Sequence, residues 1–137
     1  MKKIASGLSF LCVCILSMFM LTGCVEKTYK LVGMVDLEKD QIVYYEDLTD
    51  ENKKILDHYK NFTIKLGVRG DVILNYTIES QPQIVEYTIC GTYTLNEEVL
   101  EFTFTYADNS TYPMKQQYTN NRIIFFDETL STYLVFE

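Results

Sequence analysis

The sequence predicts a mainly β protein: an antiparallel up-and-down barrel or half-barrel of eight or nine short strands, with one short helix after the first strand. From residue 62 to residue 136, apolar side chains recur at alternate positions, which is typical of strands with one buried face. Polar turns without a helical pattern separate these runs, so successive strands should pair as an antiparallel meander. An open meander exposes its edges, which favours closure into a barrel; a two-sheet sandwich is the alternative.

The β pattern begins at Tyr29, where one clearly apolar face alternates with a mixed face as far as Asp36. A charged turn follows at 37–40. The next stretch, from Gln41 to Tyr45, is either a short second strand or an extended lead into the helix.

The helical pattern lies between Leu48 and Tyr59, where apolar residues at i, i+7, i+8 and i+11 form one stripe. Thr49 is the predicted N-cap, the two acids after it suit the positive helix start, and Asn61 can end the helix. A helix this short needs a surface to pack on. We therefore expect it to close one end or side of the sheet.

Further strands follow from alternating apolar and polar residues. Gly91 predicts a bend or bulge within the longest of them, and Pro113 predicts a strand start or an edge position. The strands are expected at 62–68, 72–78, 85–95, 100–106, 112–118, 122–126 and 132–136.

The first 23 residues predict a helical export signal. Met1-Lys2-Lys3 is a positive start, Ile4 to Met20 is uncharged and apolar, and Thr22 and Gly23 are the small residues before a cleavage site. An uncut membrane-spanning helix is one alternative, since Ile4–Val25 is long enough to cross a bilayer. Cleavage without lipidation is another.

The quartet Leu21-Thr22-Gly23-Cys24 resembles a bacterial lipobox. The resemblance implies cleavage between Gly23 and Cys24, a diacylglycerol on the Cys24 thiol and acylation of the new amine. It implies a lipoprotein anchored to the bacterial membrane, with residues 24–28 as a tether and 29–137 as a β domain on the extracytoplasmic side. Two or three acyl chains on one residue would hold the protein durably.

Charge and cysteine usage restrict the possible partners. The net charge of −7 would become −9 without Lys2 and Lys3, which argues against nucleic acid and leaves membrane attachment to the acyl chains. Cys12 and Cys14 lie in the predicted signal, and Cys24 would carry lipid. This leaves Cys90 without an intrachain partner, and we expect it to be a buried, inert, small apolar residue.

No constellation in the sequence predicts an enzyme, a cofactor or a metal. His58 is expected to be a solvated helix residue, and one histidine with one free cysteine is too few for an ordinary zinc site. Asp36, Glu38 and Asp40 resemble the start of a calcium loop, but a charged turn is favoured because Gln41 follows where such a loop needs glycine. Three acidic pairs are read as solvated turn charges: Glu46-Asp47, Glu97-Glu98 and Asp127-Glu128.

The later part of the chain resembles small bacterial lipocalin-like lipoproteins. The resemblance rests on Gly91-Thr92-Tyr93-Thr94-Leu95, on Val99 to Thr105 and on Tyr133-Leu134-Val135-Phe136. It implies a calycin-type barrel with a short helix after the first strand. The chain has no tryptophan, so the Gly-x-Trp signature of true lipocalins is absent, and of the site residues only Cys24 is carried over.

Aromatic residues on the inward faces suggest a ligand site. An apolar site with a few hydroxyl groups suits a small apolar or amphiphilic molecule. The alternative is a filled core, favoured by the narrow interior of an eight-stranded barrel, in a non-enzymatic structural or protein-binding envelope lipoprotein. The candidate ligand-binding residues are Tyr76, Tyr87, Tyr93, Phe102, Phe104 and Tyr106, and Tyr112 and Tyr118 are also expected to face inward.

Overall fold

The computed structural model describes residues 26–80 and 82–137 of the chain. The predicted signal segment, its cleavage site at Gly23 and Cys24, and the first two residues of the predicted tether lie outside the described residues. Within them the predicted fold class is confirmed: the chain is mainly β and forms a closed antiparallel barrel of eight strands with one extra strand.

The elements follow the predicted order, and one short α-helix lies among the described residues, after the second strand. They are β1 (Lys27–Asp36), β2 (Gln41–Tyr44), the 3-10 helix η1 (Tyr45–Asp47), α2 (Asp50–Leu56), β3 (Lys60–Leu66), β4 (Asp71–Ser80), β5 (Gln83–Asn96), β6 (Val99–Thr105), β7 (Thr111–Thr119), β8 (Arg122–Asp127) and β9 (Thr132–Phe136).

The barrel closes through β1. Its first residues pair with β3, and the stretch from Leu31 to Met34 pairs with β9 on the opposite edge. Backbone bonds in both directions between Lys30 and Glu137 extend this closure. The last residues of β1, Gly33 to Asp36, pair with β2. Thus β2 takes the place of β3 along the same edge of β1, beyond the point where β3 separates from it. An antiparallel meander places alternate turns at opposite ends of such a barrel.

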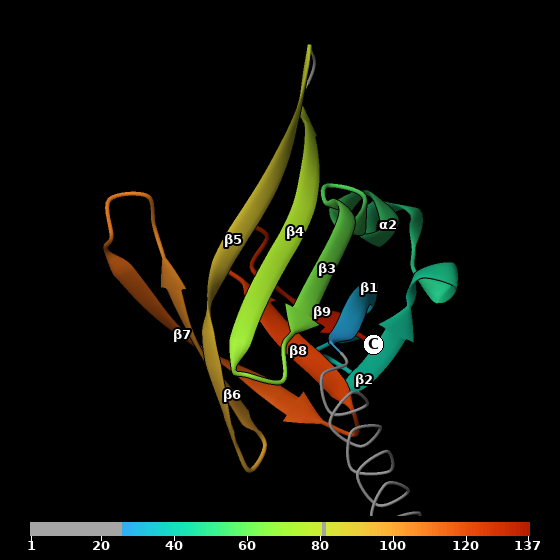
Figure 1. Ribbon diagram of the computed structural model, residues 1–137. Coiled ribbons are helices and arrows are strands. Elements are labelled where there is room, and N and C mark those ends of the chain that lie inside the picture. Colours follow the sequence, from blue (N-terminus) through green and yellow to red (C-terminus); the bar gives the residue numbers. More distant parts are fainter. Residues whose placement is uncertain (1–25, 81) are drawn as a thin grey trace, which may run out of the picture.

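We call the end that holds Lys27, Glu137 and the β3–β4, β5–β6 and β7–β8 turns the N-terminal end. The opposite end, with α2 and the β4–β5, β6–β7 and β8–β9 turns, is the open end, because neighbouring strands separate there. The last three residues of β7 pair with the start of β8, and the remainder of β7 leans away from it (Figure 1). Likewise, β5 pairs with β6 only from Gly91 onward, so β4 and β5 project as a long ribbon.

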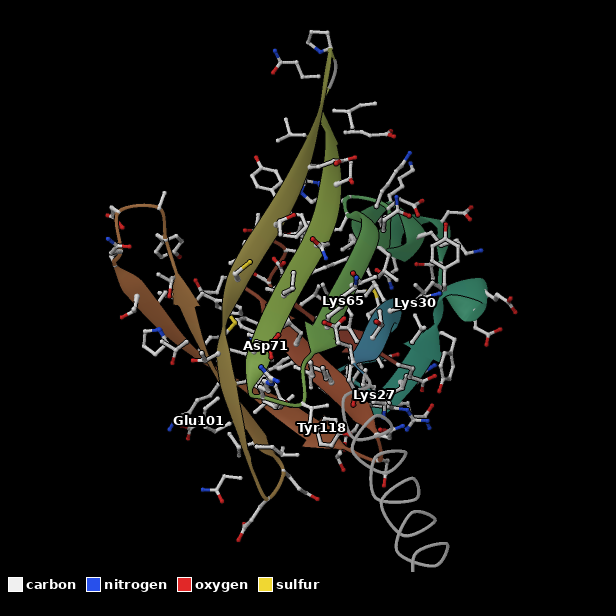
Figure 2. The ribbon with its side chains drawn as sticks, in the orientation of Figure 1. Lys27, Lys30, Lys65, Asp71, Glu101 and Tyr118 are labelled. Atoms are coloured by element: carbon white, nitrogen blue, oxygen red, sulfur yellow. The ribbon has the colours of Figure 1, made fainter. Side chains whose placement is uncertain are left out.

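The interior is filled toward the N-terminal end. Six side chains there are at most 1% exposed, and burying each contributes roughly 1.5–3 kcal/mol. Tyrosine hydroxyls seal this end: Tyr29 bonds Tyr118 at 3.0 Å, and Tyr93 donates to the Gly67 carbonyl oxygen at 2.8 Å. Lys27 lies next to Tyr118 (Figure 2) and bonds Asn121. The six buried residues are Ile64, Val72, Leu100, Phe102, Ile123 and Phe136.

The helix is shorter than predicted but begins as expected. The Thr49 hydroxyl accepts a bond from the Asn52 backbone N–H at 3.3 Å, which confirms the predicted N-cap. The helix ends at Leu56, which is buried against the barrel. Asn61 does not end it; this residue lies in β3 with a positive φ of 53°.

Within β5 the structure contradicts the prediction for Cys90 and the bulge predicted as one alternative for Gly91. Cys90 is exposed, because it lies on the outward face, one residue out of phase with the half-buried Ile89. Gly91 does not mark a bulge, since the register runs through it on both sides. It is required by close approach instead: a Cβ there would lie 2.3 Å from the Thr103 carbonyl oxygen.

Pro113 occupies the edge position that the sequence predicts. Pro113 belongs to β7 and lies opposite Thr103 of β6. Further along β7, the Tyr118 N–H points to the β6 side, where it donates to the Glu98 carbonyl oxygen. Because direction alternates along a strand, the position of Pro113 points to the opposite edge, toward β8. At that height β7 has left β8, so the missing N–H of proline disrupts no pairing.

Candidate ligand-binding site

A hollow of about 440 Å³ occupies the open end of the barrel. It exists because β7 leaves β8 and β6 leaves β5, so that no neighbouring strand covers the inward side chains at that level. Strands β3 to β8 and the segment between α2 and β3 all contribute to its wall. The lining residues are Tyr59, Phe62, Leu74, Tyr76, Ile89, Phe104, Tyr106, Tyr112, Met114, Phe125, Phe126, Asp127, Glu128 and Thr129.

Aromatic rings in mutual contact build one wall. Phe62 is buried at the base, and its ring lies 5.0 Å from Tyr76 and 5.1 Å from Tyr59 between centroids. Tyr59 meets Tyr76 nearly edge-on, at 5.2 Å and 75°. On its other side Tyr76 stacks on Tyr87, at 5.0 Å and 18°. Contacts of these kinds fix the ring orientations and so give the wall a defined shape.

Asp127 supplies a buried carboxylate in this wall. It is 7% exposed, and its Oδ2 accepts a 2.7 Å bond from the Tyr59 hydroxyl while its Oδ1 accepts a 2.9 Å bond from the Leu130 backbone N–H. The prediction that Asp127 is a solvated turn charge is therefore wrong. Its carboxylate turns inward because it caps the β8–β9 turn and meets a tyrosine from a distant segment. The neighbouring Glu128 is exposed, as expected for a turn residue.

Burial and this carboxylate shift the acidity of the nearby phenols. Burial, the bond to Asp127 and its negative charge all raise the pKa of Tyr59. The pKa of Tyr76 is also raised, first by burial and then by Tyr87, Asp127 and Tyr106. Both hydroxyls therefore stay protonated at neutral pH.

The structure brings three of the six candidate residues to the hollow: Tyr76, Phe104 and Tyr106. Tyr87 lies behind Tyr76 and supports it. Tyr93 and Phe102 lie elsewhere, in the sealed N-terminal half.

Several lining residues were missed in the sequence. The alternating pattern did place Phe62, Leu74, Ile89 and Met114 on inward faces. It did not show that the four lie at the same level along the barrel axis, where they line one hollow. No sequence pattern indicated that Asp127 faces inward. Its burial depends on Tyr59, which lies in a segment far from the β8–β9 turn in the chain.

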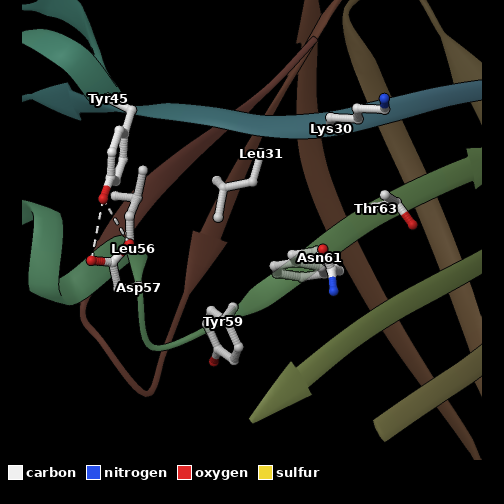
Figure 3. A pocket seen from close by; sticks show the side chains of 9 residues that line it. Lys30, Leu31, Tyr45, Leu56, Asp57, Tyr59, Asn61 and Thr63 are labelled. Atoms are coloured by element: carbon white, nitrogen blue, oxygen red, sulfur yellow. Dashed lines mark hydrogen bonds between the residues drawn. The ribbon is translucent and has the colours of Figure 1, made fainter. Parts of the chain in front are cut away.

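A second hollow, of about 390 Å³, lies where β1 leaves β3 beneath α2 (Figure 3). The Tyr45 hydroxyl donates to Asp57 Oδ1 at 2.9 Å across one side of it. Tyr59 and Phe62 line both hollows and thus form the partition between them. The rest of the second hollow is lined by the polar residues Lys30, Asn61 and Thr63 and by the aliphatic Leu31 and Leu56.

Other residues singled out in the sequence lie apart from both hollows. His58 is exposed and touches the Tyr59 ring edge-on, at 4.9 Å between centroids. Asp36 accepts backbone bonds from Glu38 at 3.0 Å and Lys39 at 3.3 Å, as in a capped turn. Across residues 26–80 and 82–137, no group of three or more His, Cys, Asp or Glu side chains is arranged to hold a metal ion.

Within that same part of the chain, no helix is both long and apolar enough to cross a membrane. No family model matches the chain, and searches among curated proteins and among solved structures find no similar protein.

Proposed function

We propose that this chain is a bacterial lipoprotein, anchored through acyl chains on Cys24, whose lipocalin-like barrel binds a small apolar or amphiphilic molecule on the extracytoplasmic side of the membrane. The observation that supports binding most directly is the aromatic hollow at the open end. Its volume of about 440 Å³ lies within the range of small-molecule sites, roughly 300–1,000 Å³.

The walls of the hollow match the chemistry of an amphiphile. Phe62, Leu74 and Phe104 are almost fully buried at its base and present only carbon atoms. Tyr106 and Tyr112 stand at the rim, 50% and 38% exposed, where each ring offers an apolar face and a hydroxyl. An alkyl chain would thus lie deep in the hollow while a polar head remains near the rim.

The position of the predicted anchor favours uptake from the aqueous side. β1 begins at Lys27, at the N-terminal end, so a chain tethered at Cys24 has about 3.5 Å of reach for each of the few intervening residues. The N-terminal end of the barrel would then face the membrane. The hollow opens at the opposite end, away from that lipid surface.

Mass spectrometry on protein extracted from its own membrane tests both parts of the proposal. Intact mass should show a chain that begins at Cys24 and carries added acyl mass. Native mass spectra should show a retained small molecule. A chain that begins at Met1 without added mass would refute the anchor.

A fluorescent fatty probe tests the hollow itself. Met114→Trp should narrow the hollow and weaken probe binding, because Met114 is half-buried in its wall. The control is Ile84→Trp, at a site 70% exposed near the tip of the β4–β5 ribbon. The absence of both a retained molecule and a probe response would contradict the binding function.

The projecting ribbon favours a second candidate function, binding of an envelope protein. From Gln83 to Cys90, β5 pairs with β4 on one edge, and no strand of the described chain pairs with its other edge. Such an edge can accept a strand from a partner. A photo-crosslinking residue at Glu86, compared with one at Glu101 on β6, should capture a defined partner in intact cells if this is the function; equal capture at both positions would contradict it.

A further inference from the structure

We propose that the molecule held in the hollow carries a cationic head, an ammonium or guanidinium group, seated among tyrosine rings and facing the carboxylate of Asp127. The inference rests on the proposed binding function, because it names the chemical class of molecule that the same hollow takes. It arises from three features of the wall: its aromatic faces, its buried negative charge and the composition of its charged residues.

The aromatic faces provide the first attraction. Eight of the fourteen lining residues are aromatic, and four of these are tyrosines. The face of an aromatic ring is negative and attracts a cation within about 6 Å of its centroid. Tyr76, Tyr106 and Asp127 all line this one hollow, so a cation held against either ring would lie in the same cavity as the carboxylate.

Asp127 provides the second attraction. Each of its oxygens accepts one hydrogen bond within the protein, from Tyr59 and from Leu130, whereas an ionised carboxylate has about four acceptor positions. Both partners are neutral, so the charge of Asp127 has no counter-ion among them. A buried charge is costly unless it is paired, and a cationic ligand would supply the missing partner.

The other charged groups around the hollow reinforce this preference. Its lining contains Asp127 and Glu128 and, among the residues that the structure describes there, no lysine, arginine or histidine. Lys60 belongs to the adjoining strand β3, but its ammonium group lies 2.7 Å from Glu79 in an exposed ion pair. An anionic ligand would therefore meet two carboxylates without a basic group to bind it.

Three probes with the same hexyl chain separate head charge from apolar burial. They are hexyltrimethylammonium, its neutral isostere with a tert-butyl head, and hexyl sulfate, titrated calorimetrically into the full-length protein in lipid nanodiscs after subtraction of empty discs. The cation should bind at least about tenfold more tightly than the neutral isostere, a difference within the range of one desolvated cation–aromatic contact. The sulfate should bind most weakly.

One variant and a matched control test the role of Asp127 in this preference. Asp127→Asn removes the charge and nearly preserves the size of the side chain, so it should reduce the ratio of cation affinity to neutral-isostere affinity severalfold. Glu101→Gln is the control, since Glu101 lies on the outside of β6, paired with Lys115 (Figure 2). Should Asp127→Asn fail to fold, Tyr106→Leu at the exposed rim is expected to lower the same ratio of affinities, because it removes an aromatic face but keeps an apolar side chain.

The outcomes distinguish this inference from the proposed function. Equal affinities for the cation and its neutral isostere would overturn the cationic head but leave amphiphile binding in place. A preference that Asp127→Asn and Tyr106→Leu leave intact would also overturn it. No binding of any probe would refute the binding function itself.

Discussion

The hydroxyl of Tyr59 donates a 2.7 Å hydrogen bond to Asp127, a residue 68 positions later in the chain. The bond ties the segment after α2 to the end of β8, across the open end of the barrel. It also fixes the partition between the two hollows, because Tyr59 lines both. One polar contact thus joins two distant segments in the wall of the candidate site.

Removal of this hydroxyl should weaken the fold. Tyr59→Phe keeps the ring but leaves Asp127 with one partner fewer, and hydrogen bonds to charged groups contribute about 1.5–3 kcal/mol. We expect the free energy of unfolding to fall by about that amount in urea titrations. Tyr133→Phe, at an exposed residue of β9, should change it by less than about 0.5 kcal/mol. Equal effects of the two variants would show that the Tyr59–Asp127 bond is energetically neutral.

Stability should decline in alkali. Burial raises the pKa values of Tyr29, Tyr76 and Tyr93, and burial together with Asp127 raises that of Tyr59. The unfolded chain loses these protons near pH 10, while the folded chain retains them at higher pH. Their contribution is therefore complete below about pH 10 and is lost as the pH rises through the raised values.

Urea midpoints measured between about pH 8 and pH 11 check this expectation. The decline should be shallower in Tyr59→Phe than in the parent protein, because one of the titrating groups is gone. A flat profile up to pH 11 would contradict the assignment of these tyrosines as buried phenols.

Gly91 should not tolerate a side chain. A Cβ at this position would lie 2.3 Å from the Thr103 carbonyl oxygen and 2.9 Å from the Phe104 Cα, and neither atom belongs to a flexible side chain. Gly91→Ala should therefore force β5 and β6 apart and cost about 1–3 kcal/mol of unfolding free energy, as overpacking does. Thr94→Ala, three residues on at an exposed position, is the control. A Gly91→Ala protein as stable as the parent would refute the close approach.

Cys90 should react with a maleimide in the folded state, because it is exposed on the outward face of β5. Peptide mass spectrometry should locate the label on Cys90 without denaturant. Cys90→Ser should remove that label and change stability by less than about 0.5 kcal/mol. Labelling that occurs only after denaturation would restore the original expectation of a buried thiol.

Local pattern was sufficient for much of the fold. The alternation through Leu100, Phe102 and Phe104 predicted an inward face, and all three side chains are buried. Asn120-Asn121 marked a tight turn, and both residues adopt the positive φ that such a hairpin needs. These features depend on neighbours only a few residues away, which is why the sequence reveals them.

The candidate site was predictable only in part. Tyr76, Phe104 and Tyr106 were correctly placed on inward faces, but the sequence did not reveal that Phe102 lies in the sealed half of the barrel and Phe104 in the open half. Height along the barrel depends on strand register and on where neighbouring strands separate. Neither is encoded by the period of two.

Local sequence patterns were enough to assign the strands, their order, most of the turns and the faces that enter the core. Three features emerged only from the folded chain: β1 meets β9, β7 leaves β8, and Asp127 is buried while Cys90 is exposed. The physical reason is the range of the interactions. Alternation reports which side chains share a face, whereas closure, splaying and the burial of a turn carboxylate depend on contacts between segments dozens of residues apart.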